Sequence, residues 1–330
     1  MAIKEYKLQE IGKFQNYENV FSKYHVSTNN MEGHKMPNFY PKLGNYFPKN
    51  SILMSNIRPY FNKVWYSDRE GSKSPNVLCF IVKNKNAISK YIYFLICDSK
   101  FNNFWSKTSK GTTMPVGDKN ALLNYKFKLP DLDDQQQIIN IIEPFERLKE
   151  KFNIKIKYLK DILHNHDKKS KEIDILNNWA KITTGKRNAN YAIQNGNYRF
   201  FSCSINKIQF CNSFSFDCES LLLAGNGDIG NVIYFNGKFD AYQRTYVIQC
   251  KNFIGNIYFS LVKNKKFFES NSKGSVIKFL TLSTISNIKI SLNKEINNIR
   301  LAILKYIFIC EKIVFNTNLI IDLIIKKMIN

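Results

Sequence analysis

The chain has 330 residues and a mass of 38.6 kDa, a length that corresponds to about two domains. Hydrophobic residues make up 44% and aromatic residues 14%, which excludes intrinsic disorder as the main state and leaves each half enough apolar side chains for a core. The 49 lysines and arginines against 26 acidic residues give a formal net charge of +23. This charge favours a polyanionic partner, either a nucleic acid or an anionic membrane surface.

Lysine supplies most of this positive charge. Only seven of the 49 basic residues are arginines, and the chain is also rich in asparagine and isoleucine. Such a composition is typical of AT-rich codon usage, so part of the charge is compatible with genomic background rather than with function. Charge by itself therefore does not separate a nucleic-acid-binding protein from other basic proteins.

The cysteines and histidines form no metal or disulfide pattern. The seven cysteines include no CxxC pair, which favours free thiols in a reducing cytosol. His164 and His166 lie two positions apart near a helix end, so they face different sides and are not expected to bind a metal. The first ten residues lack a signal-peptide core, and no apolar run approaches the roughly 20 residues that span a bilayer. We therefore expect a cytoplasmic protein with no membrane partner.

Residues 1–130 are expected to form a first globular unit. Runs of β-forming residues at Ile52–Met54, Val64–Tyr66 and Val77–Val82 are separated by turn residues, which is typical of short strands. Ile88–Cys97 instead carries apolar residues at spacings of three and four, which predicts a helix.

Residues 131–170 are expected to form a long helix with a coiled-coil seam. The acidic run Asp131–Asp134 suits a helix cap and first turn better than a metal cluster. A heptad pattern follows, in which one row is Ile138, Phe145, Phe152 and Leu159, and its companion row is Ile141, Leu148 and Ile162. We expect the helix to end near Lys168, and Pro144 either bends it or begins a second helix.

The second half of the chain repeats this order, with a mixed unit at 171–292 and a helix at 293–330. Strands are expected at Ser220–Ala224, Asn231–Phe235 and Thr245–Cys250. The apolar rows of the last helix are Ile296, Ile303, Cys310 and Ile324, then Ile299, Tyr306, Ile313 and Ile320, with Ile307, Val314, Ile321 and Met328 widening the stripe. A stripe this broad needs partners on more than one side.

Internal similarity supports a tandem repeat. Three segments of the first half reappear in order at offsets of about 163 to 165 residues. The pairs are Lys110–Thr112 with Lys273–Ser275, Asn124–Leu129 with Asn287–Leu292, and Ile92–Phe94 with Ile257–Phe259. Two such units can be related by pseudo-twofold symmetry, with their helices antiparallel. A helix of about 35 residues is roughly 50 Å long, which corresponds to an upper limit of about 15 base pairs between two half-sites on DNA.

Several segments resemble those of type I restriction-modification specificity (S) subunits. Leu129–Ile139, with Leu-Pro followed by acidic residues and a glutamine run, resembles the start of the central helix of that family. Lys110–Pro115 and Lys273–Leu280 resemble the Gly-Ser/Thr loop near the end of each target recognition domain. Further resemblances lie at Ile52–Pro59, Gly185–Phe201, Leu222–Gly230 and Phe239–Thr245. The second helix start, Leu292–Glu295, departs from the pattern because it lacks the proline and the glutamines.

The resemblance implies an α+β fold with two similar globular α/β target recognition domains. Each domain is followed by a long helix, and the two helices pack as an antiparallel coiled coil. It implies double-stranded DNA with a bipartite site as the ligand. It implies two methyltransferase (M) subunits that use S-adenosylmethionine, and optionally endonuclease (R) subunits, as partners. The chain itself is then expected to be non-catalytic, with no catalytic residue, cofactor or metal of its own.

The one nucleotide-like motif is Gly225–Gly230, which reads G-x-G-x-x-G. The run after it, Asn231–Phe235, is strand-like, whereas a dinucleotide site needs a helix there, so a glycine turn between strands is the better interpretation. The sequence also lacks a G-x-x-x-x-G-K-[ST] loop and the motifs of amino-methyltransferases and nucleases.

Lysine, arginine, asparagine and threonine side chains in or beside turns are the candidate DNA contacts, since phosphates bind cations and backbone N–H groups and bases bind arginine and amides. In the first unit these are Arg58, Lys63, Lys107, Lys110 and Thr112. In the second unit they are Lys186, Arg187, Asn226, Arg244, Lys273 and Lys278. Arg58 and Arg244 could instead each pair with a carboxylate, and Trp105, Tyr198 and Phe200 are expected in the core.

Two other functions fit the same features. One is a stand-alone sequence-specific DNA-binding protein, such as an orphan specificity protein or a repressor. The other is an enzyme that binds a nucleotide at Gly225–Gly230. Tight binding of duplex DNA without a partner favours the first, and thermal stabilisation by nucleotides favours the second.

Overall fold

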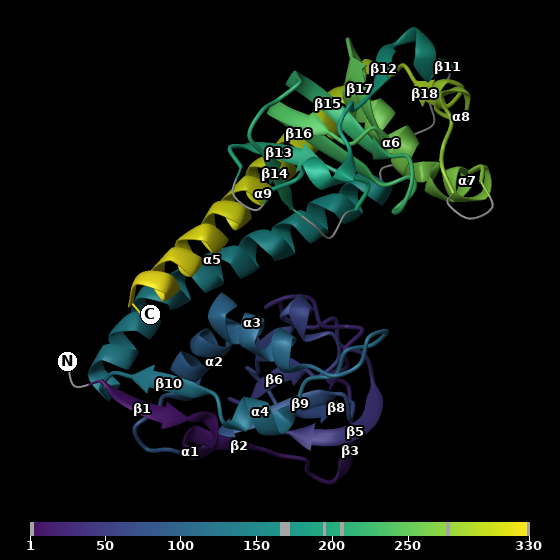
Figure 1. Cartoon of the computed structure of the whole chain (residues 1–330). Helices are drawn as coiled ribbons and strands as arrows, with labels where there is room; N and C mark the ends of the chain where they lie inside the picture. Colours follow the sequence, from purple (N-terminus) through teal and green to yellow (C-terminus); the bar gives the residue numbers. More distant parts are fainter. Residues whose placement is uncertain (1–2, 166–171, 194–195, 205–207, 275–277, 329–330) are drawn as a thin grey trace. The chain divides into compact units, whose positions relative to one another are not determined.

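The computed structural model describes residues 3–165, 172–193, 196–204, 208–274 and 278–328 (Figure 1). It divides into two units, of which the first is Met1–Lys151 with Val314–Asn330 and the second is Phe152–Ile313. Each unit is a mixed α/β structure that includes part of both long helices. Among the described residues, no helix is long and apolar enough to cross a membrane.

The first unit consists mostly of short strands. Its elements are β1 (Lys4–Lys7), α1 (Leu8–Ile11), β2 (Gly12–Phe14), β3 (Asn19–Ser22), β4 (His25–Val26), β5 (Lys42–Phe47), β6 (Ile52–Ser55), the 3-10 turn η1 (Pro59–Phe61), β7 (Val64–Tyr66), β8 (Gly71–Lys73), β9 (Val77–Val82), α2 (Ser89–Cys97), α3 (Ser99–Thr108), α4 (Lys119–Leu123) and β10 (Lys126–Leu129). The strands expected at Val64–Tyr66 and Val77–Val82, and the helix expected at Ile88–Cys97, are confirmed.

Two four-stranded sheets and one strand pair build this unit. The central sheet has the order β2-β9-β6-β7 with antiparallel neighbours, the other has the order β3-β5-β8-β4, and β1 pairs with β10. Helices α2 and α3 lie along one side of the central sheet (Figure 1). The core between them includes Phe80, Tyr91, Phe94 and Trp105, all almost fully buried, so the predicted core position of Trp105 is confirmed.

The first long helix, α5 (Leu132–Asn165), begins as the sequence predicts. The Asp131 carboxylate accepts a hydrogen bond of 2.9 Å from the backbone N–H of Asp134, which caps the helix. The helix is continuous through Pro144, so the predicted alternative of two separate helices is wrong. A mid-helix proline costs about 3 kcal/mol. Burial of side chains such as Ile138 and Ile142, at about 1.5–3 kcal/mol each, offsets that cost. The expected helix end near Lys168 lies outside the described residues.

The second unit has a larger sheet. Its elements are β11 (Ile173–Ile175), the 3-10 turn η2 (Leu176–Asn178), β12 (Ala180–Thr184), the 3-10 turn η3 (Ala189–Tyr191), β13 (Tyr198–Phe201), β14 (Gln209–Cys211), β15 (Phe216–Ala224), β16 (Val232–Ala241), β17 (Thr245–Cys250), α6 (Ile254–Lys263), α7 (Lys265–Ser270), α8 (Leu282–Ser286) and β18 (Lys289–Ser291), followed by α9 (Lys294–Met328). The strand at Thr245–Cys250 matches its prediction, and β15 and β16 are longer than predicted.

The sheet order β12-β17-β15-β16-β13-β14 contains a four-strand set that corresponds to the central sheet of the first unit. Strands β12, β17, β15 and β16 occupy the places of β2, β9, β6 and β7, and their neighbours are likewise antiparallel. Strand β11 pairs with β18 as β1 pairs with β10. Strand β13 also pairs in parallel with the end of β16, as β4 pairs in parallel with β8. The tandem repeat read from the sequence is therefore a repeat of the fold.

In each long helix, one of the apolar rows expected to be buried is exposed, and the row one residue further along the chain is buried. In α5 the companion row expected to be buried, Ile141 and Leu148, is exposed, while Ile142 and Ile156 are buried instead. In α9, Ile299, Tyr306 and Ile320 of one predicted row are exposed, whereas Ile307 and Ile321, of the row predicted to widen the stripe, are buried together with Arg300. Both rows consist largely of apolar residues, and the tertiary contacts within each unit select the row that is buried.

Candidate nucleic-acid interface

One loop is built in the same way in both units. In the first unit, Lys110 and Val116 form a β-bridge, and Gly111 has a φ of +94°. In the second unit, Lys273 and Phe279 form the same bridge, and Gly274 has a φ of +103°. Both glycines adopt the left-handed conformation that other residues rarely take, which explains why Lys-Gly is repeated. Residues 275–277 of the second loop lie outside the described residues.

Each of these loops leads into a short capped helix. The Asp118 side chain accepts hydrogen bonds from the backbone N–H groups of Asn120 and Ala121 at the start of α4. Thr281 accepts one from the N–H of Thr284 at the start of α8. Asp118 also forms a 2.8 Å ion pair with Lys110, which lowers the pKa of the carboxyl group and raises that of the ammonium group. Lys110 remains highly exposed in this pair.

In the first unit the loop lies beside the residues that follow β6. The Arg58 N–H donates to the Pro115 carbonyl at 2.7 Å, and the Gly117 N–H donates to the Asn56 carbonyl at 2.9 Å. These contacts bring the exposed candidates Arg58, Lys110 and Thr112 to one end of the central sheet. No ion pair of Arg58 occurs among the described residues, so its alternative role as a partner of a carboxylate has no support there.

The two other lysines predicted for this surface differ from each other. Lys107 is exposed in the last turn of α3. Lys63 is half-buried, and its Nζ donates to the Thr28 carbonyl at 2.7 Å. Burial lowers the pKa of Lys63, and Arg58 lowers it further. Lys63 therefore ties the start of β7 to the loop that follows β4, a role that the sequence did not indicate.

His34 lies in the same region, near Asn62, and its Nε2 is buried without a hydrogen-bond partner among the described residues. Burial lowers the pKa of His34 to about 4, and the charge of Lys149 contributes. The unfolded chain protonates this group near pH 6.5, so its contribution to stability is complete above that pH and is lost as the pH falls towards 4. We expect a loss of about 2 kcal/mol at about pH 5 relative to neutral pH. Urea unfolding at both pH values measures this loss, and His34→Gln should remove most of it.

In the second unit, four candidates gather around the corresponding loop. The Arg244 guanidinium lies 5.1 Å from the centre of the Phe279 ring. Phe279 is the bridge partner of Lys273. Lys278 is the exposed residue just before Phe279. The Arg244 carbonyl accepts a 2.9 Å hydrogen bond from Gly225, which places Asn226 next to it.

The Lys186–Arg187 segment lies beside the strand end at Ala241. The Cβ of any residue at Gly185 would lie 2.0 Å from the Ala241 carbonyl oxygen, so only glycine permits this approach. Arg187 pairs with the buried carboxylate of Asp240 at 3.2 Å and lies 4.5 Å from the Tyr191 ring. Its guanidinium is therefore held against Asp240 and Tyr191 although the side chain stays 42% exposed, and Lys186 is exposed as well.

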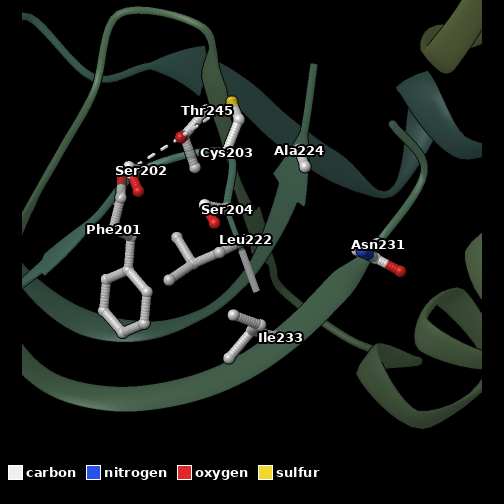
Figure 2. A pocket seen from close by; sticks show the side chains of 9 residues that line it. All are labelled: Phe201, Ser202, Cys203, Ser204, Leu222, Ala224, Asn231, Ile233 and Thr245. Carbon is white, nitrogen blue, oxygen red and sulfur yellow. Dashed lines mark hydrogen bonds between the residues drawn. The ribbon is translucent and has the colours of Figure 1, made fainter. Parts of the chain in front are cut away.

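A small pocket lies beneath the Gly225–Gly230 loop. Figure 2 shows its lining, which includes Phe201, Leu222 and Ile233 and contains no lysine or arginine. The Cys203 carbonyl accepts a hydrogen bond from the Asp228 N–H at 3.1 Å, and its thiol lies 3.2 Å from the Arg244 carbonyl. The loop leads into β16, a strand. The pocket thus supports the loop that carries Asn226. None of its described lining residues is a cation, and the nearby Lys265 ammonium donates to the side chain of Asn231 at 2.9 Å.

The aromatic residues predicted in the core, the cysteines and the possible metal ligands have the following environments. Phe200 is almost fully buried, as predicted, and Tyr198 is half-buried against Phe214. The seven cysteines are free. Within the described ranges, no group of three or more His, Cys, Asp or Glu residues could hold a metal ion.

Sequence reasoning missed Tyr60 and Phe61, which lie in η1 immediately after Arg58. Both rings are about half exposed, at 51% and 50%. A comparison of the β6–β7 connection with the β15–β16 connection would have singled them out, because the second repeat has Gly225–Asn231 there, with no aromatic residue.

Comparison with known proteins agrees with this duplicated architecture. A sequence profile described as the type I restriction modification DNA specificity domain matches residues 5–158 and again 157–314. The specificity subunit of the type I restriction enzyme EcoDI from Escherichia coli is 39% identical over 120 residues, which are 36% of this chain and 26% of that relative.

Among solved structures, the S subunit of a type I restriction-modification system from M. genitalium has the same fold. It aligns with a TM-score of 0.63 at 14% identity, over 100% of this chain and 96% of that one. The HsdS subunit from Thermoanaerobacter tengcongensis aligns with a TM-score of 0.41 at 14% identity, over 99% and 96% of the two chains. Since the family profile covers nearly the whole chain in two consecutive copies, the chain belongs to the type I restriction-modification DNA specificity family.

Proposed function

We propose that the chain is the DNA sequence-specificity subunit of a type I restriction-modification complex. Its two target recognition domains, residues 1–130 and 171–292, each read one half of a bipartite site in double-stranded DNA. The helical segments 131–170 and 293–330 set the spacing between the half-sites. The observation that carries this proposal is the duplicated loop, in which Lys110 and Lys273 start the same glycine turn beside Arg58 and Arg244 respectively.

The chemistry of these loops suits DNA. Exposed lysines neutralise phosphates, and arginine presents a planar set of donors that matches guanine in the major groove. We infer that the exposed side chains of Arg58, Lys107, Lys110 and Thr112 contact one half-site. Lys186, Asn226, Arg244, Lys273 and Lys278 contact the other. Lys63, bonded to the Thr28 carbonyl, and Arg187, paired with Asp240, help to fix these surfaces.

The spacing function rests on contacts between the two long helices within each unit. In the second unit, Lys160 of α5 pairs with Glu311 of α9 at 2.9 Å, and Leu163 shares a core with Leu304. In the first unit, Ile142 shares a core with Ile321. Residues early in α5 thus share a core with residues late in α9, and residues late in α5 share one with residues early in α9. This order supports an antiparallel coiled coil. At 1.5 Å per residue, such a rod limits the spacing to about 15 base pairs.

We further propose that catalysis belongs to partner subunits. Two methyltransferase subunits, and optionally endonuclease subunits, would dock on the helices. Exposed apolar side chains on α9 support this, because a soluble helix rarely leaves so many uncovered. They are Ile299, Tyr306, Ile309, Leu319, Ile320 and Leu323.

Mapping of DNA methylation tests the proposal. In cells that express the chain with its neighbouring methyltransferase, we expect one methylated motif made of two short segments at a fixed spacing. Deletion of the chain alone should abolish methylation at that motif. Methylation that persists after the deletion would contradict the proposal. Tight binding of one uninterrupted sequence without any partner would instead favour a stand-alone DNA-binding protein.

The two arginines beside the loops should affect different halves of the site. Arg58→Ala is expected to weaken DNA binding by about 1–3 kcal/mol and to relax base preference in one half-site only. Arg244→Ala should do the same in the other half-site. Selection from a pool of random duplexes, followed by sequencing, measures both effects. Arg147→Ala, which removes an exposed arginine from α5, is the control and should leave both halves unchanged.

A further inference from the structure

The turn η1 carries a pair of aromatic side chains at the surface. The Tyr60 and Phe61 rings lie 4.6 Å apart between centroids, and each is about half exposed. Single exposed aromatic residues are common on proteins. Two adjacent ones that contact each other, beside a surface proposed to bind a ligand, need a further explanation.

The backbone on both sides of the pair is in an unusual conformation. Arg58 has a φ of +50° and Asn62 a φ of +45°. Arg58 is the third residue after β6, and the third residue after β15 is Gly227, with a φ of +60°. Asn62 is the second residue before β7, and the second residue before β16 is Gly230, with a φ of +80°. The first repeat therefore has side chains where the second has glycines.

Left-handed backbone at a non-glycine residue costs on the order of 1–3 kcal/mol, and such residues gather at functional sites. Glycine in these two places would relieve the strain, as the second repeat demonstrates. The strained connection nevertheless carries an exposed arginine and the two exposed rings. A requirement for the side chains themselves accounts for this choice of residues.

Hydrogen bonds hold the connection rigidly. The N–H of Arg58 donates to Pro115, and the side-chain amide of Asn62 donates to the Cys97 carbonyl at 3.0 Å. The N–H of Phe61 donates to the Arg58 carbonyl at 3.0 Å, and Pro59 is buried. The rings are thus presented in a fixed position, so little conformational entropy is lost when they bind a ligand.

The charges around the pair identify a polyanion as the ligand. Arg58 is exposed next to it, and Lys63 lies 5.7 Å from the Phe61 ring. Helix α3, which carries Lys107 in its last turn, packs against η1. Glu32 raises the pKa of Lys63 slightly against the effect of burial, but Glu32 itself pairs with Lys35. Flat apolar groups inside a cationic surface are the combination that proteins use to wedge into a base step of duplex DNA.

We propose that Tyr60 and Phe61 form an aromatic wedge that inserts at a base step of the DNA half-site bound by the first unit. The inference rests on the proposed function and adds an asymmetry to it. The second unit, with Gly227 and Gly230 in the equivalent connection, contacts its half-site without a wedge. A base step is therefore unstacked on binding in one half of the bipartite site, and none is unstacked in the other half.

The test uses the full chain with any subunits that copurify from its host, and a duplex selected from a random pool. Tyr60→Ala/Phe61→Ala should lower affinity for this duplex about 10- to 100-fold, which is the effect of losing base–aromatic stacking. The slope of affinity against salt concentration should not change, because no charge is removed. Phe61→Leu, which retains apolar bulk, should have an intermediate effect. Phe21→Ala, at an exposed phenylalanine in β3, is the matched control and should change affinity less than twofold.

A spectroscopic signal reports insertion directly. The fluorescence of 2-aminopurine, placed at successive positions of the selected duplex, should increase at one base step of one half-site when the wild-type chain binds. With the double variant, the fluorescence at that step should not increase. Wild-type affinity and fluorescence of a folded double variant would overturn the wedge while leaving the proposed function intact. A double variant that no longer retains a copurifying subunit, but otherwise binds the duplex as the wild type does, would also overturn the wedge and leave the proposed function intact. A wild-type chain that enriches no sequence from the pool would overturn both.

Discussion

Affinity of the full chain for its duplex should fall about a thousandfold or more when monovalent salt rises from roughly 50 to 200 mM. Each phosphate neutralised by lysine or arginine releases condensed counterions, and about six such contacts produce a loss of this size. The surfaces around the two duplicated loops carry at least that many exposed basic residues. They are Arg58, Lys107, Lys110, Lys186, Arg244, Lys273 and Lys278.

Individual lysines can be assigned by the slope of log affinity against log salt. Lys273→Gln or Lys107→Gln should each lower the slope by about 0.9 if the side chain contacts a phosphate. Lys13 and Lys181 provide matched controls. They are exposed at equivalent positions in β2 and β12, and should not alter the slope. A slope near zero for the wild-type chain would contradict the assignment of these surfaces to DNA. This measurement also separates functional charge from a lysine-rich composition.

Replacement of Arg300 by alanine should destabilise the second unit by about 3 kcal/mol or more. Arg300 lies in α9 and is almost fully buried. Its guanidinium is 3.6 Å from the centre of the Phe259 ring, and Nη1 donates to Asn256 at 2.9 Å. Asn256 in turn donates to the carbonyls of Ser291 and Asn293. Loss of the side chain leaves a cavity and an unsatisfied amide oxygen, and both are costly in a core.

Urea unfolding of the full chain measures this effect. The guanidinium links α9 to Asn256 of α6, and Asn256 links α6 to the end of β18, so Arg300→Ala should lower the stability of the second unit. Arg147→Ala removes an arginine whose ion pair with Glu143 is exposed, and it should change stability by less than about 1 kcal/mol. Equal stability of the two variants would show that the buried arginine contributes little to the packing of α9.

Local patterns in the sequence were sufficient for the order of elements. The strands at Val64–Tyr66, Val77–Val82 and Thr245–Cys250 have the predicted bounds, because β-branched and aromatic runs between turn residues have few alternatives. The repeated Lys-Gly pair also predicted the duplicated loop, since the left-handed backbone at Gly111 and Gly274 requires glycine.

The surface chemistry was only partly accessible in this way. Lysines near turns look alike in a sequence, yet Lys63 is bonded to the Thr28 carbonyl and Arg187 to Asp240, whereas Arg58 and Arg244 are exposed. Their partners lie 35 and 53 positions away along the chain, a separation that periodicity does not detect. The exposed pair Tyr60–Phe61 has the composition of a core segment, so composition alone points the wrong way for it.

The sequence by itself determined that two similar units alternate with two long helices, because hydrophobic periodicity and the repeat are local properties of the chain. The tertiary structure alone decided which apolar row of each helix is buried and that α5 continues through Pro144. Either row of an Ile- and Leu-rich helix could serve as a core, and the cost of a proline is small beside the burial of several isoleucines. The choice follows from what packs against the helix, which no local pattern contains.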